Sequence, residues 1–370
     1  MDKKRKWIII ISAALFVMAA VGVFAYTTYF YNNKKYTDYK VVYETPRVED
    51  GVVNYQSYND IVLKCGREGT SALDAEGKES FNGGYDMKNP VADVCESYVV
   101  VADQGEKRFV VFNGDDSGTP VDTTLPIVSA KVTANGVVAV LLEDVSSNVI
   151  QIYNPYASED RLLAEVPTNV QTQGYPVDYD ISPNGENLVT DFMLPKQGNP
   201  SYHVSFYNFS DVGQEKNQLV GAKTYSEQAV GKVEFMNNDY ACVYIDNGYE
   251  VYSNFLKPQI VSQNTFDGKI TSLLANEDYV CVIIDKKMTI YSLKGNELLT
   301  KELTYEYNKV RLFGKELYFT TDHQCVILRS NGMEKWVAEF KNKVEEVFPA
   351  SGMSHYFLIT DQNIQEINIK

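Results

Sequence analysis

The 370-residue sequence is poor in the side chains and motifs on which most enzyme active sites depend. Its three histidines, His203, His323 and His355, do not have the spacing of metal ligands. It contains neither the Gly-x-Ser-x-Gly sequence of a nucleophilic serine nor the Gly-x-x-x-x-Gly-Lys sequence of a phosphate loop. We therefore predict no catalytic residue, no cofactor and no metal site.

Cysteine is also scarce, and its pattern excludes the usual cysteine-based sites. The five cysteines include no Cys-x-x-Cys pair, which argues against a zinc or redox motif. Their odd number and scattered spacing do not suggest a disulfide framework. We expect all of them to be buried, reduced and to pack as small apolar residues; they are Cys65, Cys95, Cys242, Cys281 and Cys325.

Outside the N-terminus, basic residues are outnumbered by acidic ones. The net charge is −15, and residues 1–36 carry six basic groups and one acidic group, so residues 37–370 hold −20. An acidic domain of this kind is a poor ligand for nucleic acid. The charge fits a need for solubility; the alternative is that the domain binds cations or a basic partner.

What the sequence does contain is a repeated apolar run that ends in aspartate. The interval between successive copies is 41, 47, 55, 39, 37 and 39 residues. The seven aspartates are Asp103, Asp144, Asp191, Asp246, Asp285, Asp322 and Asp361. A repeat of about 40 residues with several short strands per unit indicates an all-β fold, a β-propeller.

The ends of the chain predict the number of blades. Seven full four-strand units follow one another, the first beginning near Asp60 and the last near Leu317. Two strands are left over at each end of the domain, at residues 40–55 and 356–369. Pairing the spare strands gives an eighth blade and closes the ring, which removes exposed strand edges. We predict eight blades within one domain, residues 40–370, with seven blades as the alternative.

The repeats resemble those of known propellers. Ile181-Ser-Pro-Asn-Gly185 is similar to a turn of WD40-like repeats, and Val99–Asp103 followed by Phe109–Asn113 resembles the quinoprotein-type repeat. The whole chain resembles a family of uncharacterised, membrane-anchored propeller proteins of Gram-positive bacteria. It departs from WD40 repeats proper, because no Trp-Asp pair closes any unit. The resemblance implies a fold and no activity.

The N-terminus predicts a single membrane span. Residues 1–6 form a basic head, residues 7–26 are free of charge, and residues 27–39 form a polar tether. Twenty helical residues extend about 30 Å, the thickness of a bilayer core. The basic head favours a cytoplasmic N-terminus, which places the propeller outside a bacterial cell membrane. A cleaved signal peptide is the alternative, but the apolar run is longer than usual for one.

The repeated aspartates allow two interpretations. All seven are expected at the same end of equivalent strands, near one mouth of the central channel. The favoured interpretation is structural, since an aspartate commonly accepts hydrogen bonds from its own turn. The alternative is a cation site at the channel mouth.

The function that fits these features best is a non-enzymatic binding or scaffolding module at the cell surface. Its expected partners are the membrane, through the N-terminal helix, and a protein or another component of the cell envelope. The alternative is an extracytoplasmic enzyme of a quinoprotein-like or glycan-processing type, which would need convergent catalytic groups in the channel mouth. A sensor acting through residues 27–39 is a weaker idea, because the cytoplasmic head is too short for a signalling domain.

Overall fold

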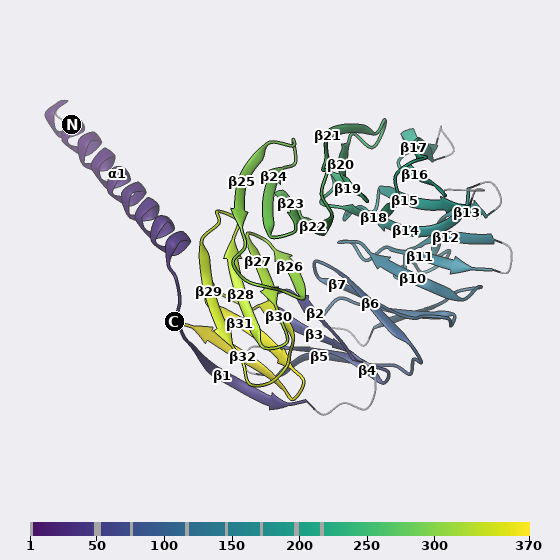
Figure 1. The fold of residues 1–370 in the computed structure, drawn as a ribbon, viewed down its shortest axis with the longest axis horizontal. Helices are drawn as coiled ribbons and strands as arrows, with labels where there is room; N and C mark the ends of the chain where they lie inside the picture. The colour runs from purple at the N-terminus through teal and green to yellow at the C-terminus, as the bar shows by residue number, and fades with distance from the viewer. Residues whose placement is uncertain are drawn as a thin grey trace.

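Eight four-stranded antiparallel sheets are arranged as blades around a central channel, as Figure 1 shows. The coordinates are a computed structural model that describes residues 3–47, 53–74, 77–114, 118–144, 147–170, 173–195, 200–214 and 218–370. The head residues Met1 and Asp2 lie outside these ranges. The prediction of an all-β propeller with eight blades is confirmed.

Each blade runs from a first strand at the channel to a fourth strand at the rim. The first strands are β2 (Asn54–Tyr58), β6 (Pro90–Cys95), β10 (Ile127–Val132), β14 (Tyr175–Ile181), β18 (Val230–Phe235), β22 (Ile270–Ala275), β26 (Lys309–Phe313) and β30 (Val344–Pro349). The second strands are β3 (Ile61–Cys65), β7 (Tyr98–Asp103), β11 (Val138–Glu143), β15 (Asn187–Leu194), β19 (Ala241–Ile245), β23 (Tyr279–Ile284), β27 (Glu316–Thr320) and β31 (His355–Thr360).

The outer half of each blade is built from the third and fourth strands. The third strands are β4 (Gly69–Leu73), β8 (Arg108–Phe112), β12 (Ser147–Tyr153), β16 (Ser201–Asn208), β20 (Gly248–Ser253), β24 (Lys287–Ser292), β28 (Gln324–Arg329) and β32 (Asn363–Ile369). The fourth are β5 (Glu79–Gly84), β9 (Thr119–Asp122), β13 (Leu162–Asn169), β17 (Leu219–Tyr225), β21 (Gln259–Thr265), β25 (Glu297–Glu302), β29 (Glu334–Glu339) and β1 (Tyr39–Pro46). A four-residue helix, α2 (Asp211–Gln214), follows β16.

Ring closure differs from the predicted two-plus-two arrangement. The closing blade has the order β1-β32-β31-β30, so one strand from the N-terminal end joins three from the C-terminal end. The pairing runs from Tyr39 opposite Ile369 to Pro46 opposite Asn363. The predicted units began one strand late, at the second strand of each blade. A repeat interval is the same wherever counting starts, so it does not identify the strand that faces the channel.

Apolar side chains fill the spaces between neighbouring blades. The second strands are almost wholly buried, because each lies between two adjacent sheets. Between the sixth and seventh blades, for example, Cys281 and Ile283 of β23 pack with Leu317 and Phe319 of β27. All five cysteines are free thiols, and four are buried; Cys95 is half-buried, contrary to the expectation of full burial.

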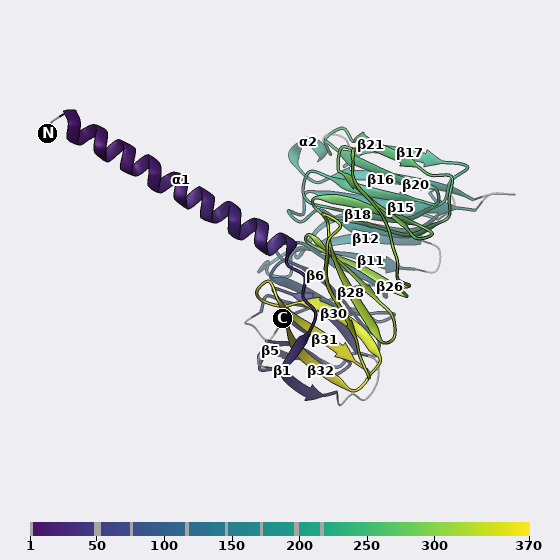
Figure 2. The same cartoon turned by 60° about the vertical axis from the view of Figure 1, so that its left-hand side comes forward.

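Helix α1 (Lys3–Asn33) points away from the propeller in both Figure 1 and Figure 2. Many of the apolar side chains described in its later part are exposed, including Phe16, Val17, Val21 and Phe24. In the described part of the chain, no helix meets the combined length and apolarity expected of a membrane span. The helix continues to Asn33, so it takes in half of the segment that the sequence suggested as a tether.

The short connector after α1 is fixed to the propeller. The amide of Tyr36 donates to the carbonyl of Lys335 on β29 at 2.8 Å, and Arg329 donates to the carbonyl of Lys34 at 2.8 Å. Lys35 forms a 2.7 Å ion pair with Glu334. The chain therefore passes along the rim of the seventh blade before it enters the eighth as β1.

Candidate functional site

The central channel contains a cavity of about 1090 Å³. Its wall is formed chiefly by first strands, including β2, β6, β26 and β30, with contributions from β18 and β22. Lys309, Lys343 and Glu345 lie where these strands begin, whereas Phe313 and Phe348 lie where they end. The cavity is therefore charged toward one mouth of the channel and more apolar toward the other.

Side chains from several first strands bind peptide groups at the open edge of the next one. A first strand has no neighbour on its channel side, so its peptide groups need other partners. Gln56 donates to the carbonyl of Ala92 at 2.7 Å, and Asp93 accepts from the amide of Val132 at 2.9 Å. Asp180 accepts from the amide of Phe235 at 2.7 Å in the same way. These contacts fix the spacing of the blades around the channel.

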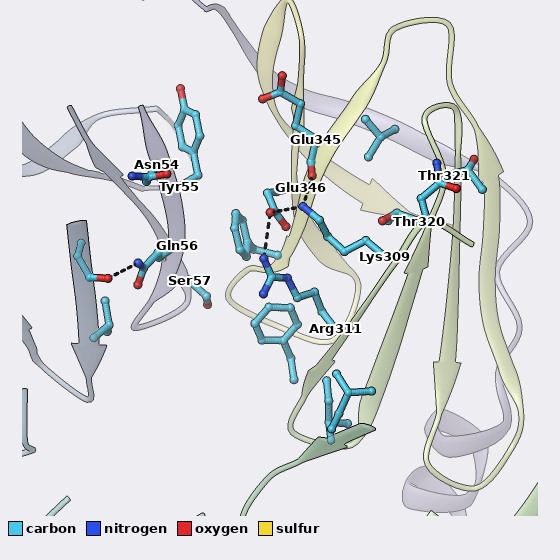
Figure 3. A pocket seen from close by; sticks show the side chains of 18 of the residues that line it. Asn54, Tyr55, Gln56, Ser57, Lys309, Arg311, Thr320, Thr321, Glu345 and Glu346 are labelled. Atoms are coloured by element: carbon cyan, nitrogen blue, oxygen red, sulfur yellow. Dashed lines mark hydrogen bonds and ion pairs between the residues drawn. The ribbon is translucent and has the colours of Figure 1, made fainter. Parts of the chain in front are cut away.

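Charged side chains of the seventh and eighth blades meet inside the cavity, as Figure 3 shows. Lys309 and Arg311 reach from β26 toward Glu346 on β30, with nitrogen–oxygen distances of 2.6 and 3.1 Å. Lys309 also donates to the carbonyl of Glu345 at 3.2 Å. No prediction from the sequence included this group, although charged residues at alternate positions of a strand expected to be enclosed were a usable signal.

Outside the cavity lining, the first strands of the second and fourth blades carry acidic side chains, Asp93, Asp178 and Asp180. The Nζ atom of Lys131 lies 3.4 Å from the Oδ1 atom of Asp93, and the charge of Lys131 also interacts electrostatically with Asp180. Burial raises the pKa of Asp180 to about 7, although the positive charge of Lys131 opposes this shift. Burial likewise raises the pKa of Asp178, whose carboxylate accepts a 3.0 Å hydrogen bond from the amide of Val233.

Asp191 is an unusual acid behind these first strands, on the second strand of the fourth blade. It lies within β15, directly opposite Asp178 of β14, and is fully buried. Neither of its carboxylate oxygens has a hydrogen-bond partner among the described residues. Burial, with a smaller contribution from the charge of Asp178, raises the pKa of Asp191 to about 8. The side chain is therefore a protonated acid at neutral pH.

The strand register shows that the seven aspartates are not equivalent. Asp144, Asp246, Asp285 and Asp361 each directly follow the last residue of a second strand. Asp191 does not lie in a turn, which corrects its assignment as a turn carboxylate. Asp191 pairs with the first residue after a bulge in the neighbouring first strand. Four other blades have the same bulge, and there the paired residue is Leu141, Tyr244, Ile283 or Ile359.

Two of the aspartates bind the chain that leads into their own blade. The carboxylate of Asp103 accepts from the amides of Lys88 and Asn89 at 3.0 and 2.8 Å. That of Asp361 accepts from the amide of Lys343 at 3.1 Å. Asp322 instead forms a 3.7 Å ion pair with Lys343. These contacts are structural and leave the carboxylates engaged within the fold.

The residue types that could hold a metal are dispersed. His203 lies on β16, His323 in the turn after β27 and His355 on β31, so each is in a separate part of the blades. Among the described residues, no three His, Cys, Asp or Glu side chains are grouped in a way that could bind a metal ion. Burial raises the pKa of Cys281 to about 12, so this thiol is not an activated nucleophile.

The sequence matches the profile of one protein family over nearly the whole propeller. Residues 32–369 fit the profile described as a family of unknown function, DUF5711. The chain belongs to this family. The profile begins at the end of α1 and includes the connector and all eight blades, so the family is defined by the propeller. No match was found among curated protein sequences.

Two solved structures share the fold at low sequence identity. Sqt1 from Saccharomyces cerevisiae has a TM-score of 0.60 and 13% identity, covering 90% of this chain and 99% of its own. BamB from Moraxella catarrhalis has a TM-score of 0.55 and 10% identity, covering 90% of this chain and 98% of its own. At these identities the likeness shows a shared propeller architecture alone.

Proposed function

We propose that this chain is a non-enzymatic binding module that holds a protein partner at the central channel. The observation that supports this function is the cavity of about 1090 Å³, whose wall carries charged, amide and aromatic side chains. A cavity with a few converging polar groups on a rigid scaffold is a common place for a ligand. The first strands that line it are held in position by the inter-blade hydrogen bonds of Gln56, Asp93 and Asp180.

Site-specific cross-linking in the producing cells tests this proposal. A photoreactive amino acid is placed at Asn308, which is exposed at the charged mouth of the cavity, and the matched control carries it at Leu298 on the rim strand β25. We expect a single partner adduct of constant mass from Asn308 and none from Leu298. The proposal fails if Asn308 gives no adduct, or if both positions give the same set of adducts.

We also propose that α1 anchors the propeller to a bacterial membrane, with the propeller on the outer side. The proposal rests on the uncharged run of residues 7–26 and on the exposed apolar side chains of Phe16, Val17, Val21 and Phe24. Exposed apolar side chains in such a number are costly in water and favourable in a lipid environment. The fixed connector would then hold the propeller at a set position relative to the membrane surface.

Membrane fractionation tests the anchor. We expect the wild-type chain to remain in the membrane fraction after an alkaline wash. The double variant Val17→Glu, Val21→Glu should be released, because two charges in the helix oppose insertion. Val42→Glu is the control, since Val42 is exposed on β1 of the propeller. Release of the wild-type chain by the wash would rule the anchor out.

A further inference from the structure

Two cations share one carboxylate at the β26 side of the cavity. Around the cavity, three carboxylates each have one cationic partner: Glu234 pairs with Lys232, Asp322 with Lys343, and Glu345 with Arg47, which lies outside the cavity lining. Glu346 has two, because Lys309 and Arg311 both contact its Oε1 atom. The lining as a whole holds four cationic and four acidic side chains, so the excess positive charge is local, at the contact of β26 with β30.

Arg311 has capacity to bind a further acceptor. A guanidinium has five N–H groups in a planar fork that suits a carboxylate. Among the described residues, Arg311 contacts Glu346 through Nη2, and its side chain is 50% exposed. Lys309 lies two residues earlier on the same strand, so the two side chains leave β26 on the same face, about 7 Å apart at the backbone. Figure 3 shows both directed into the cavity.

The surroundings define the ligand that this pair would accept. Phe313 and Phe348 line the cavity beyond Arg311, with ring centroids 6.0 Å apart in an edge-to-face arrangement. The acids Asp93, Asp178 and Asp180 lie on first strands of other blades. They would repel an anion and so favour its placement at β26. The site combines a cationic fork with a nearby aromatic surface.

We propose that Lys309 and Arg311 form a carboxylate-binding site, with Phe313 and Phe348 accepting the apolar group attached to the carboxylate. This inference rests on the proposed binding function and names the chemistry of that site. The ligand is an acid with an adjacent apolar group, either an acidic segment of a protein partner or a free small acid. Glu346 is the internal counter-ion that holds the two cations in place when the site is empty.

Calorimetric titration of the full chain with 3-phenylpropionate tests the site. We expect binding, and an affinity at least about tenfold weaker for the neutral analogue 3-phenylpropionamide, since a charge-assisted contact is lost. Arg311→Gln and Lys309→Gln should each weaken binding of the acid by about tenfold. Arg108→Gln is the matched control, because Arg108 is a similarly exposed, ion-paired arginine on β8 of the second blade.

A variant that gains affinity separates this result from a loss of folding. Glu346→Gln removes the internal counter-ion and should tighten binding of the acid by about threefold. The inference is wrong if the amide binds as tightly as the acid, if the acid does not bind, or if Arg311→Gln retains wild-type affinity. If the cross-link from Asn308 persists in Arg311→Gln, partner binding stands and the carboxylate site does not.

A peptide pair identifies the source of the carboxylate. Binding of acetyl-Phe-Glu-Phe-amide, together with weaker binding of acetyl-Phe-Gln-Phe-amide, would support an acidic protein segment as the ligand. Binding of 3-phenylpropionate without binding of either peptide would support a free small acid. Equal affinity for the two peptides would show that the carboxylate is not recognised and would overturn the proposal.

Discussion

Asp191 and Asp178 face each other across the β14–β15 strand pair, and the carboxylate of Asp191 has no hydrogen-bond partner among the described residues. In other blades the position of Asp191 is taken by an apolar or aromatic residue such as Leu141 or Ile359. A buried, unpaired carboxylate is tolerated when it is protonated, because the neutral acid is far less costly to bury than the anion.

This pair makes stability depend on pH. Burial raises the pKa of Asp191 to about 8, above its value in the unfolded chain, so the folded state binds the proton more tightly. The stabilisation is complete below the unfolded-state pKa, near 4, and is lost as the pH rises toward 8. The stability of wild type relative to Asp191→Asn should therefore fall by up to about 1.4 kcal/mol per pH unit in this window.

Urea unfolding at several pH values between 5 and 9 checks this prediction. Asp178 and Asp180 are present in both proteins, so the difference between wild type and variant reports Asp191 together with its coupling to Asp178. Asp191→Leu places the residue of the third blade at the same register position and should remove the same pH dependence. A constant difference between wild type and Asp191→Asn at all pH values would contradict the assignment.

The buried carboxylate of Glu250 should be a major contributor to stability. It is fully buried and accepts contacts from Lys223 at 2.5 Å, Tyr225 at 2.6 Å and Tyr252 at 2.8 Å. Glu250→Ala should destabilise the protein by about 3–5 kcal/mol, because it leaves its partners without their acceptor. The control is Asp122→Ala, which breaks an exposed pair with Arg108 and should cost less than about 1 kcal/mol. Similar losses from both variants in urea unfolding would refute this.

Two adjacent glycines of β5 should respond differently to substitution by alanine. A Cβ atom at Gly83 would lie 2.0 Å from the ring of the buried Phe112, whereas a Cβ atom at Gly84 would meet nothing within 4 Å. Gly83→Ala should therefore lower stability by about 1–3 kcal/mol through overpacking. Gly84→Ala should be neutral or slightly stabilising, because it restricts the unfolded chain. Thermal unfolding of the two variants compares them directly. Equal melting temperatures would show that the ring of Phe112 can move away from the added methyl group without a loss of stability.

The connector between α1 and the propeller should stabilise the seventh blade. Tyr36 is buried, forms a parallel bridge with Trp336 and belongs to the same apolar cluster. Tyr36→Ala should cost about 3 kcal/mol, as expected for loss of a buried aromatic side chain. The matched control, Tyr175→Ala, removes a tyrosine that is 51% exposed and should have little effect. Unfolding followed by the fluorescence of Trp336 measures both, and an unchanged midpoint for Tyr36→Ala would mean that the connector is not firmly docked.

The sequence by itself determined the strand content, the repeat of about 40 residues and the closure of eight blades. These features follow from local patterns, since apolar runs and turns recur at a fixed interval and the leftover strands at the two ends must pair. The net negative charge of the propeller and the separation of its histidines along the chain likewise follow directly from the sequence.

Only the tertiary structure decided which strand of each unit lines the channel and which side chains meet there. Lys309, Arg311 and Glu346 are brought together by the contact of two blades, and no spacing along the chain records that contact. The register also separated Asp191 from the other aspartates, because β15 continues to Leu194 and places Asp191 within the strand, opposite Asp178. Side-chain neighbours between blades depend on packing, and sequence periodicity does not encode packing.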